Sequence, residues 1–261
     1  MIFLKKSLGQ NFLNDKNIVN KIINLVKIKG RNVIEIGPGG GALTDDILKK
    51  LPKKLFLIEK DFNLAKKLND KYNENEKVKI FNADILKFDI EKILLKDTII
   101  IGNLPYNISS QIFVTILRQK IWPPKFSDLI FMFQKELGDK IISNFSSKNY
   151  GRLSILTELR LNVLKKFIVS PNCFFPKPKV RSLVIHFKPK KKNLFNIKNI
   201  ATLEKVTNIF FSNKRKMINK SIKKILNQKK IDKLKTLNLM SRPSDLKPEF
   251  YYKIAELLES N

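Results

Sequence analysis

The chain has 261 residues, of which 43% are hydrophobic, and its 52 Lys and Arg against 23 Asp and Glu give a net charge of +29. One cysteine and one histidine exclude an intramolecular disulfide, a cysteine-rich zinc site and most histidine-based catalysis. The apolar runs are shorter than a membrane span and the N-terminus has no signal-peptide core, so we expect a soluble cytoplasmic protein.

The positive charge favours a polyanionic partner, either nucleic acid or an anionic membrane surface. A genome-wide nucleotide bias that enriches Lys, Asn and Ile is the plain alternative. The charge is unevenly distributed, because residues 188–261 hold 19 Lys and Arg but 6 Asp and Glu. We therefore expect a nucleic-acid partner, contacted by the C-terminal part of the chain, and no membrane partner.

The N-terminal part alternates strands and helices. An arm of hydrogen-bonding residues precedes a helix that begins after Asn14 or Asp15 and extends to about residue 26. Residues 32–36 are predicted to form a strand, which runs into the glycine turn 37–42 and then a helix. A second strand ends in Glu59, at the distance from the glycine turn that suits a carboxylate binding ribose hydroxyls.

Two further strands also lead into polar residues. Residues 78–81 lead to Asp84, and the apolar run 98–102 leads to Asn103-Leu104-Pro105-Tyr106. Ligands of open α/β sheets bind at the carboxyl ends of the strands, so we expect the chemistry there. Helices over 62–72 and 109–119 follow the second and fourth strands.

The remaining strands complete a mainly parallel sheet that is covered by helices and closed by an antiparallel edge hairpin. They comprise 129–133, a strand that reaches Val169, and 182–187, where the only histidine, His186, is expected to be an ordinary strand residue. Helices are expected over 135–145 and ahead of the strand that reaches Val169.

Four helical patterns close the chain, over 200–211, 216–226, 229–237 and 248–258. We therefore expect a catalytic domain over 1–189 and a small all-helical domain over 190–261.

The glycine turn is compatible with two cofactors. Gly37 to Ala42 fits the pattern G-x-G-x-x-G/A, which together with Glu59 is typical of a dinucleotide site, but S-adenosylmethionine domains use a similar turn and acid. Asp84 suits an adenine amino group. Asn103-Leu104-Pro105-Tyr106 supplies two oxygen acceptors and an aromatic ring, which methylation of an adenine amine needs. A simple turn after a strand is the alternative for this tetrapeptide.

Several motifs taken together resemble the ribosomal RNA adenine dimethyltransferase family, and the resemblance extends over nearly the whole chain. They are Gly9-Gln10-Asn11-Phe12-Leu13, Glu35-Ile36-Gly37-Pro38-Gly39, Asn103 through Ser109, Gln134-Lys135-Glu136, Tyr150-Gly151-Arg152-Leu153-Ser154, Phe174 through Val180 with Ser182, and Asn213-Lys214-Arg215-Lys216. The resemblance implies a Rossmann-like, S-adenosylmethionine-dependent methyltransferase sheet with a small C-terminal all-helical domain.

The resemblance also implies roles for individual residues. The implied cofactor-binding residues are Asn11, Leu13, Gly37, Glu59, Asp84 and Asn103. Asn103 and the Leu104 carbonyl are implied to hold N6 of the target adenine. Tyr106 and Phe174 are implied to enclose the base. The residues implied to bind RNA phosphates are Lys214, Arg215 and Lys216. Phe175 and Arg181 depart from the family pattern, where a small or polar residue and an acid are frequent.

Within the family the chain most resembles the branch that dimethylates two adjacent adenosines in the 3′-terminal hairpin of small-subunit rRNA. A monomer acting on a 30S assembly particle, with a role in small-subunit biogenesis, is therefore expected. Two alternatives stay open: a large-subunit adenine methyltransferase of the macrolide-resistance type, and a non-catalytic ribosome-assembly or nucleic-acid-binding factor.

Overall fold

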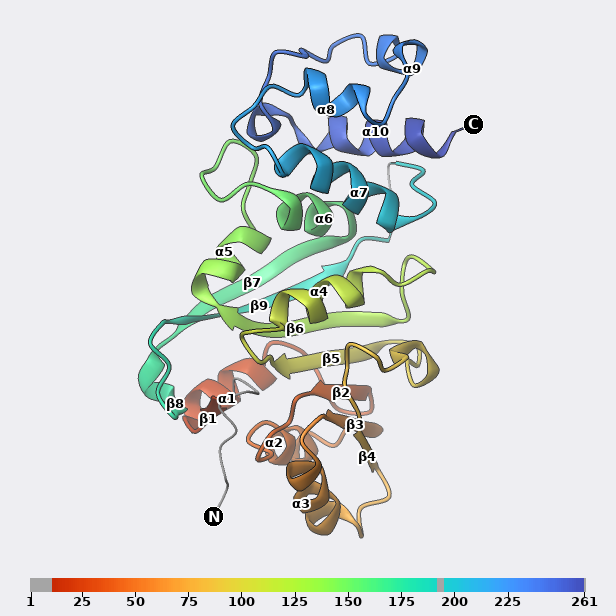
Figure 1. Cartoon of the computed structure of the whole chain (residues 1–261). Coiled ribbons are helices and arrows are strands. Elements are labelled where there is room, and N and C mark those ends of the chain that lie inside the picture. Colours follow the sequence, from red (N-terminus) through yellow and green to blue (C-terminus); the bar gives the residue numbers. More distant parts are fainter. Residues whose placement is uncertain (1–10, 192–194, 261) are drawn as a thin grey trace. The chain divides into compact units, whose positions relative to one another are not determined.

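The computed structural model describes residues 11–191 and 195–260, which divide into two compact units (Figure 1). The described residues up to Gly138, together with Val163–Pro189, form the first unit. Asp139–Asn162 and the described residues from Lys190 onward form the second. Gly9 and Gln10 of the N-terminal arm motif lie outside the described residues.

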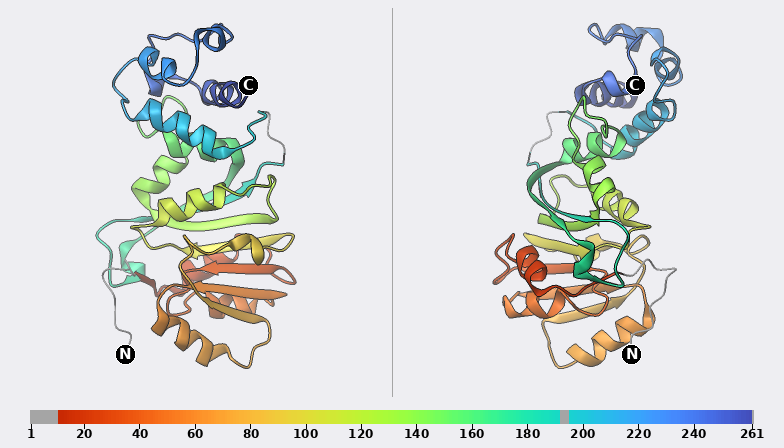
Figure 2. Two further views of the ribbon diagram at one scale, coloured as in Figure 1. Left: turned by 45° about the vertical axis from the view of Figure 1, so that its right-hand side comes forward. Right: turned by 90° about the vertical axis from the view of Figure 1, so that its left-hand side faces the viewer.

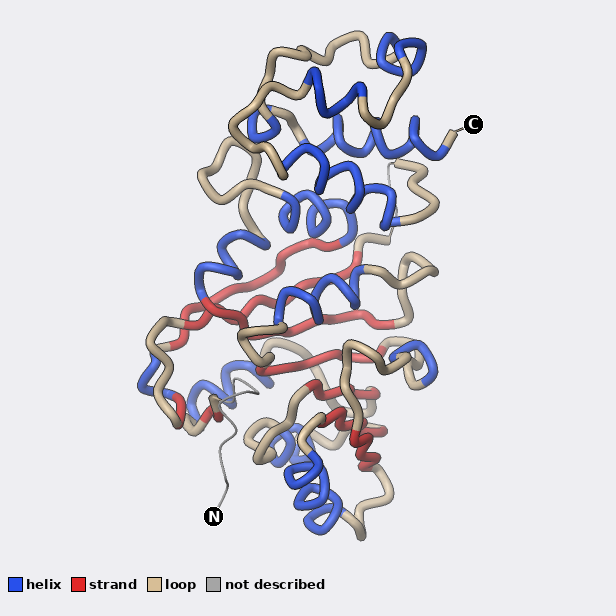
Figure 3. The backbone as a smooth tube through the Cα atoms, viewed as in Figure 1, coloured by secondary structure: helices blue, strands red, loops and turns tan. Residues whose placement is uncertain are grey.

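A seven-stranded sheet has the order β4-β3-β2-β5-β6-β9-β7. Figure 3 draws its strands in red. The strands of this sheet are β2 (Asn32–Ile36), β3 (Lys54–Glu59), β4 (Val78–Asn82), β5 (Thr98–Asn103), β6 (Phe126–Gln134), β7 (Leu161–Val169) and β9 (Ser182–Pro189). The first five pair in parallel, and β9 is antiparallel to β6. The prediction of a mainly parallel sheet that closes with antiparallel pairing is thus confirmed.

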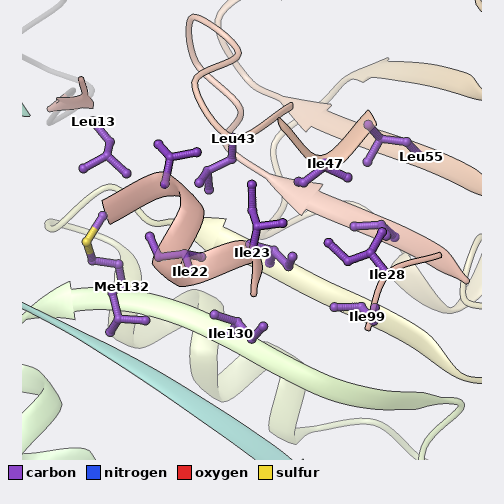
Figure 4. Packing of buried hydrophobic residues seen from close by; sticks show 14 of the residues in the cluster. Leu13, Ile22, Ile23, Ile28, Leu43, Ile47, Leu55, Ile99, Ile130 and Met132 are labelled. Carbon is purple, nitrogen blue, oxygen red and sulfur yellow. The ribbon is translucent and has the colours of Figure 1, made fainter. Parts of the chain in front are cut away.

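Side-chain alternation gives this sheet two apolar faces, each covered by helices. One face buries alternate residues such as Val33, Ile99 and Ile130 against α1 (Lys16–Ile23) and α2 (Thr44–Lys49) (Figure 4). On the other face α4 (Ser109–Leu117) places Phe113 5.6 Å from Phe133 and 5.3 Å from Phe187, between ring centroids. Figure 2 shows α1 and α4 on opposite sides of the strands.

Of the remaining helices of this sheet region, α3 (Phe62–Tyr72) and α5 (Lys135–Ile141) begin at their predicted first residues, and the short 3₁₀ helix η2 (Ile90–Lys92) was not predicted. The Asp61 carboxylate accepts hydrogen bonds from the N–H groups of Asn63 and Leu64, so that α3 has the bounds predicted. The helix η2 precedes β5, and α5 follows β6.

A second, two-stranded ribbon joins distant parts of the chain. The strand β1 (Phe12–Leu13) pairs antiparallel with β8 (Phe174–Phe175), which follows the 3₁₀ helix η3 (Pro171–Cys173). Phe12 lies opposite Phe175, and Leu13 lies opposite Phe174. Two-residue strands carry no periodicity, so this pairing was not predicted.

The helical unit contains more of the chain than the sequence indicated. Its elements are α6 (Arg152–Arg160), α7 (Ile200–Phe211), α8 (Asn219–Lys223), α9 (Gln228–Asp232), the 3₁₀ helix η4 (Pro243–Asp245) and α10 (Pro248–Glu259). The predicted boundary after 189 coincides with one boundary between the units, but residues 139–162 belong to the helical unit and not to the unit of the sheet.

Two buried tyrosines explain why residues 139–162 pack with the C-terminal helices. The Tyr150 hydroxyl donates to the Leu246 carbonyl at 3.0 Å, and the Tyr252 hydroxyl of α10 donates to the Ile155 carbonyl of α6 at 2.9 Å. A buried phenol needs such a partner, so these bonds fix α6 against the later helices.

The helices α8 and α9 are shorter than the predicted spans 216–226 and 229–237. The N–H groups of Ile218 and Asn219 donate to carbonyls of Ser241 and Leu239, so they are not free to extend α8 toward its N-terminus. Within the described parts of the chain, no helix combines the length and the apolar character that a membrane span requires.

Candidate active site

A pocket with an empty volume of about 1100 Å³, part of it open to solvent, lies at the carboxyl ends of β2, β3 and β5. Eight of the predicted site residues line it: Asn11, Leu13, Gly37, Glu59, Asp84, Asn103, Leu104 and Tyr106. The sheet thus brings together groups that the sequence separates by up to 95 positions, as expected for strand ends in an open α/β sheet.

The glycine turn forms the floor of this pocket. Gly37 and Gly39 have φ of +67° and +57°, a left-handed conformation that side chains other than glycine adopt at a cost. A Cβ atom on Gly39 would lie 2.6 Å from Cε1 of Phe12, because the Phe12 ring packs on the turn. The turn therefore leaves its backbone open to a ligand on one side and covered by Phe12 on the other.

Glu59 ends β3 as a buried carboxylate held by main-chain donors. Its Oε2 accepts the Gly39 N–H at 3.0 Å, and its Oε1 accepts the Asp61 N–H at 2.8 Å. Burial raises the pKa of Glu59, and these two hydrogen bonds oppose that rise. Each carboxylate oxygen has a second lone pair, so Glu59 can still accept two hydroxyl donors, as the hydroxyls of a ribose require.

Asp84 sits beyond the end of β4 and is more open to solvent. Its Oδ2 pairs with the Lys60 ammonium at 2.8 Å, and its Oδ1 accepts the Leu86 N–H at 3.0 Å. The hydrogen bond from Lys60 is the largest influence and lowers the pKa of Asp84, so it is ionised at neutral pH. Asp84 is thus an acceptor suited to an exocyclic amino group.

Glu35 is a pocket residue to which sequence reasoning gave no role, although it opens the Glu35-Ile36-Gly37 motif. It is 1% exposed, and its Oε2 accepts the Thr44 hydroxyl at 2.7 Å. Burial raises the pKa of Glu35 to about 8; the Thr44 bond opposes this rise, and the charge of Glu59 adds to it. Glu35 is therefore mostly protonated at neutral pH and adds little negative charge beside Glu59.

The Asn103 amide has a defined orientation. Its Nδ2 donates to the main-chain carbonyl of Asn11 at 2.9 Å, which fixes the arm to the end of β5 and leaves Oδ1 as the acceptor. Among the described residues, no donor reaches Asn103 Oδ1 or the main-chain carbonyl of Leu104. Two neighbouring acceptors at the pocket are thus available for the two N–H groups of one amine.

Gly102 allows the tetrapeptide to turn into the pocket. A Cβ atom at Gly102 would lie 2.8 Å from Cδ2 of Leu104 and 2.9 Å from the Ile36 carbonyl. The Leu104 side chain, 1% exposed, therefore folds back over the glycine and anchors the turn. The anchored side chain holds the Leu104 backbone, and with it the open carbonyl, in one place.

Tyr106 presents an aromatic ring with a fixed hydroxyl. The hydroxyl shares a hydrogen bond of 2.6 Å with Ser182 Oγ at the start of β9. Burial raises the pKa of Tyr106, so the phenol stays protonated and is not a base. The Tyr106 carbonyl accepts the Ser109 hydroxyl at 3.2 Å, which links the turn to the first residue of α4.

The structure places Phe174 opposite the pocket residue Leu13, and its assignment to the target base stays a prediction. Phe174 is 3% exposed, belongs to the buried cluster that includes Leu13 and Val184, and does not line the pocket. Successive residues of a strand point to opposite faces, and the pairing with Leu13 turns Phe174 inward. Phe12, which sequence reasoning did not single out, is the phenylalanine that lines the pocket.

The predicted RNA contacts lie in the helical unit. Lys214, Arg215 and Lys216 are exposed between α7 and α8, and the Lys214 ammonium donates to the Tyr150 carbonyl at 3.4 Å. They form a cationic turn that can meet phosphates.

Taken together, the pocket fits a nucleoside. Glu59 matches vicinal hydroxyls, Asp84 matches an exocyclic amino group, and the left-handed glycines leave room where side chains would fill the floor. A second amine can be held by Asn103 and Leu104.

Comparisons with known proteins agree with this geometry. A family model described as ribosomal RNA adenine dimethylase matches residues 2–260. The chain is 44% identical over 259 residues to a ribosomal RNA small subunit methyltransferase A from Pelagibacter ubique (strain HTCC1062), covering 98% of this chain and 97% of that protein.

Solved structures show the same fold. A dimethyladenosine transferase from Plasmodium falciparum superposes with a TM-score of 0.78 at 26% identity, covering 93% of this chain and 95% of the other. The 23S rRNA methyltransferase ErmE gives a TM-score of 0.67 at 22% identity, covering 95% of this chain and 100% of the other. The predicted Rossmann-like methyltransferase sheet with C-terminal helices is therefore confirmed.

Proposed function

Because the chain belongs to the ribosomal RNA adenine dimethylase family, we propose that it transfers methyl groups from S-adenosylmethionine to N6 of two adjacent adenosines in the 3′-terminal hairpin of small-subunit (16S) rRNA. The observation that carries this proposal is the pair of open acceptors, Asn103 Oδ1 and the Leu104 carbonyl, beside a pocket that fits a nucleoside. The small-subunit name of the relative at 44% identity supports this substrate over large-subunit rRNA.

The cofactor is held by the pocket groups that match its parts. Glu59 accepts hydrogen bonds from the ribose hydroxyls, and Asp84 accepts one from the adenine amino group. Gly37 has no side chain, so the backbone can approach the cofactor closely. Asn11 and Leu13 cover the cofactor from the arm. When bound, S-adenosylmethionine supplies an electrophilic methyl group on a sulfonium.

Catalysis rests on positioning of the target amine. The N6 lone pair of adenine is delocalised into the ring, which makes the amine a weak nucleophile. Acceptance of its two N–H bonds by Asn103 Oδ1 and the Leu104 carbonyl favours a pyramidal nitrogen whose lone pair points at the methyl group. Tyr106 stacks on the base and, being protonated, takes no proton. The proton leaves N6 to solvent.

The helical unit supplies the RNA contacts. Lys214, Arg215 and Lys216 pair with phosphates, which makes binding depend steeply on salt. The partner is a small-subunit assembly particle, contacted by a monomer in the cytoplasm, and modification accompanies small-subunit biogenesis. A non-catalytic assembly factor would not need the two open acceptors at the pocket, Asn103 Oδ1 and the Leu104 carbonyl.

The test is mass spectrometry of nuclease-digested rRNA after incubation of the enzyme and cofactor with unmodified small-subunit particles. We expect two adjacent N6,N6-dimethyladenosines in the 3′-terminal hairpin. Large-subunit RNA serves as the control substrate and should stay unmodified. Modified adenosine in the large-subunit RNA alone, or in neither RNA, would falsify the proposal.

A further inference from the structure

One aromatic side chain beside the pocket has no part in the chemistry described above. Phe175 is 64% exposed, whereas its neighbour Phe174 is 3% exposed. The ribbon β1–β8 explains this difference, because Phe175 lies opposite Phe12 and Phe174 lies opposite Leu13. Directly opposed residues of an antiparallel pair share one face of the ribbon. Phe175 therefore projects from the same face as Phe12.

The face shared by Phe12 and Phe175 borders the pocket. The Phe12 ring packs on Gly39 and lines the pocket, while Phe175 is outside the lining. Opposed residues place their Cβ atoms about 5 Å apart. Phe175 thus lies at the rim, next to the aromatic ring that closes the glycine turn.

The segment after Phe175 is cationic. Lys177, Lys179 and Arg181 are exposed, and the sequence has no Asp or Glu between residues 170 and 182. No carboxylate of the described residues forms an ion pair with these three side chains. An exposed aromatic ring followed by unneutralised cations is the combination that binds single-stranded nucleic acid, through base stacking and phosphate contacts.

We propose that Phe175 is a stacking platform for the unpaired base next to the target adenosine, and that Lys177 and Lys179 hold the adjoining phosphates. This inference rests on the proposed function, because two adjacent adenosines are modified one at a time. While one base occupies the pocket, the next is tethered to it by one phosphodiester and lies at the rim. A purine offers the larger stacking surface, so Phe175 favours an adenine neighbour.

The test uses the full-length protein and three variants: Phe175→Ala, Phe175→Trp and Phe62→Ala. Phe62, the first residue of α3, is 66% exposed and lies outside the pocket lining, so it is the matched control. The substrates are unmodified small-subunit particles with the natural adjacent adenosines, and particles in which either adenosine is replaced by uridine. A second measurement is the binding of fluorescent single-stranded oligoadenylate in the presence of S-adenosylhomocysteine.

We expect Phe175→Ala to lower kcat/KM on natural particles about ten-fold, and to weaken oligoadenylate binding by a similar factor. On uridine particles the loss should shrink to about two-fold, since less stacking is removed. Phe175→Trp should restore both values, Phe62→Ala should leave both near wild type, and cofactor affinity should not change in any variant.

The inference is overturned if Phe175→Ala equals wild type on natural particles, or loses the same factor on both kinds of particle. A wild-type enzyme that forms no dimethyladenosine on natural particles refutes the proposed function instead. In that case the oligoadenylate measurement decides the inference alone, and equal binding by wild type and Phe175→Ala overturns it.

Discussion

Substitutions of Asn103 by alanine and by aspartate separate the roles of its amide donor and its amide oxygen. The side chain donates to the Asn11 carbonyl at 2.9 Å and leaves Oδ1 open at the pocket. Asn103→Ala removes both groups, whereas Asn103→Asp keeps an acceptor, loses the donor and places a carboxylate against the Asn11 carbonyl. We therefore expect alanine to impair chemistry and cofactor binding, and aspartate to impair mainly the holding of the arm.

The magnitudes follow from what each atom does. Loss of one positioned hydrogen-bonding group at a reacting centre lowers the rate on the order of 100-fold. Loss of the bond that holds the arm costs about 1 kcal/mol, or about five-fold in the dissociation constant of the cofactor. The chemical step of Asn103→Asp should accordingly be at least about ten times faster than that of Asn103→Ala.

The assay is single-turnover methyl transfer to unmodified small-subunit particles with saturating cofactor, paired with calorimetric titration of the cofactor. Asn82→Ala is the matched control: its amide donates to the Glu59 main-chain carbonyl at 3.0 Å, yet Asn82 does not line the pocket. It should keep a rate within about two-fold of wild type. If Asn103→Ala reacts as fast as Asn82→Ala, the assignment of Oδ1 to the target amine is wrong.

Three further predictions concern the glycine turn, the interior strand β6 and the helical unit. Gly39→Ala should weaken cofactor binding more than ten-fold, because it adds a clash within 2.6 Å to the left-handed strain. Gly30→Ala is the control, because Gly30 has φ of +74° but a Cβ atom there would have nothing within 4 Å. This variant carries the backbone strain alone and should bind the cofactor with wild-type affinity in the same titration. Asp128 of β6 accepts hydrogen bonds from Arg31 at 2.8 Å and Ser127 at 3.0 Å and shares one with His186 at 2.8 Å. Burial raises the pKa of Asp128, but these hydrogen bonds outweigh it and hold the pKa well below its usual range. The stabilisation from Asp128 is therefore present above the unfolded pKa near 3.9 and lost as the pH falls below it. Asp128→Asn should lower the free energy of unfolding at pH 7 by about 3 kcal/mol. Denaturant titrations at several pH values should show that this free energy falls less steeply with acid than in wild type. An unchanged dependence on pH would show that Asp128 is not the group responsible. Neutralising the cationic turn 214–216 should reduce the slope of log K against log salt by about 2 without changing cofactor affinity, and an unaltered slope would exclude this turn from the RNA contact.

Local signals were sufficient to predict most elements of the sheet. The helix α3 has its predicted bounds because Asp61 caps it and its apolar residues repeat with the helical period. Glu59, Asp84 and Asn103 meet in one pocket because parallel strands end at one edge.

Local sequence patterns did not predict the contacts between distant segments of the chain. The inward turn of Phe174 depends on its pairing with Leu13, and neither residue reveals that pairing locally. The assignment of residues 139–162 to the helical unit depends on hydrogen bonds such as that from Tyr150 to Leu246. A helical pattern shows which face is apolar but not which partner covers it.

The β1–β8 ribbon also has a consequence for the order in which the protein is made. Phe12 and Leu13 leave the ribosome early, but their partners in β8 are synthesised about 160 residues later. Until Phe174 and Phe175 emerge, the residues of the arm that line the pocket have no strand to pair with. A nascent chain that has completed β5 therefore already carries Glu59, Asp84 and Asn103 but lacks the paired arm, so the pocket is complete only after β8 has been synthesised.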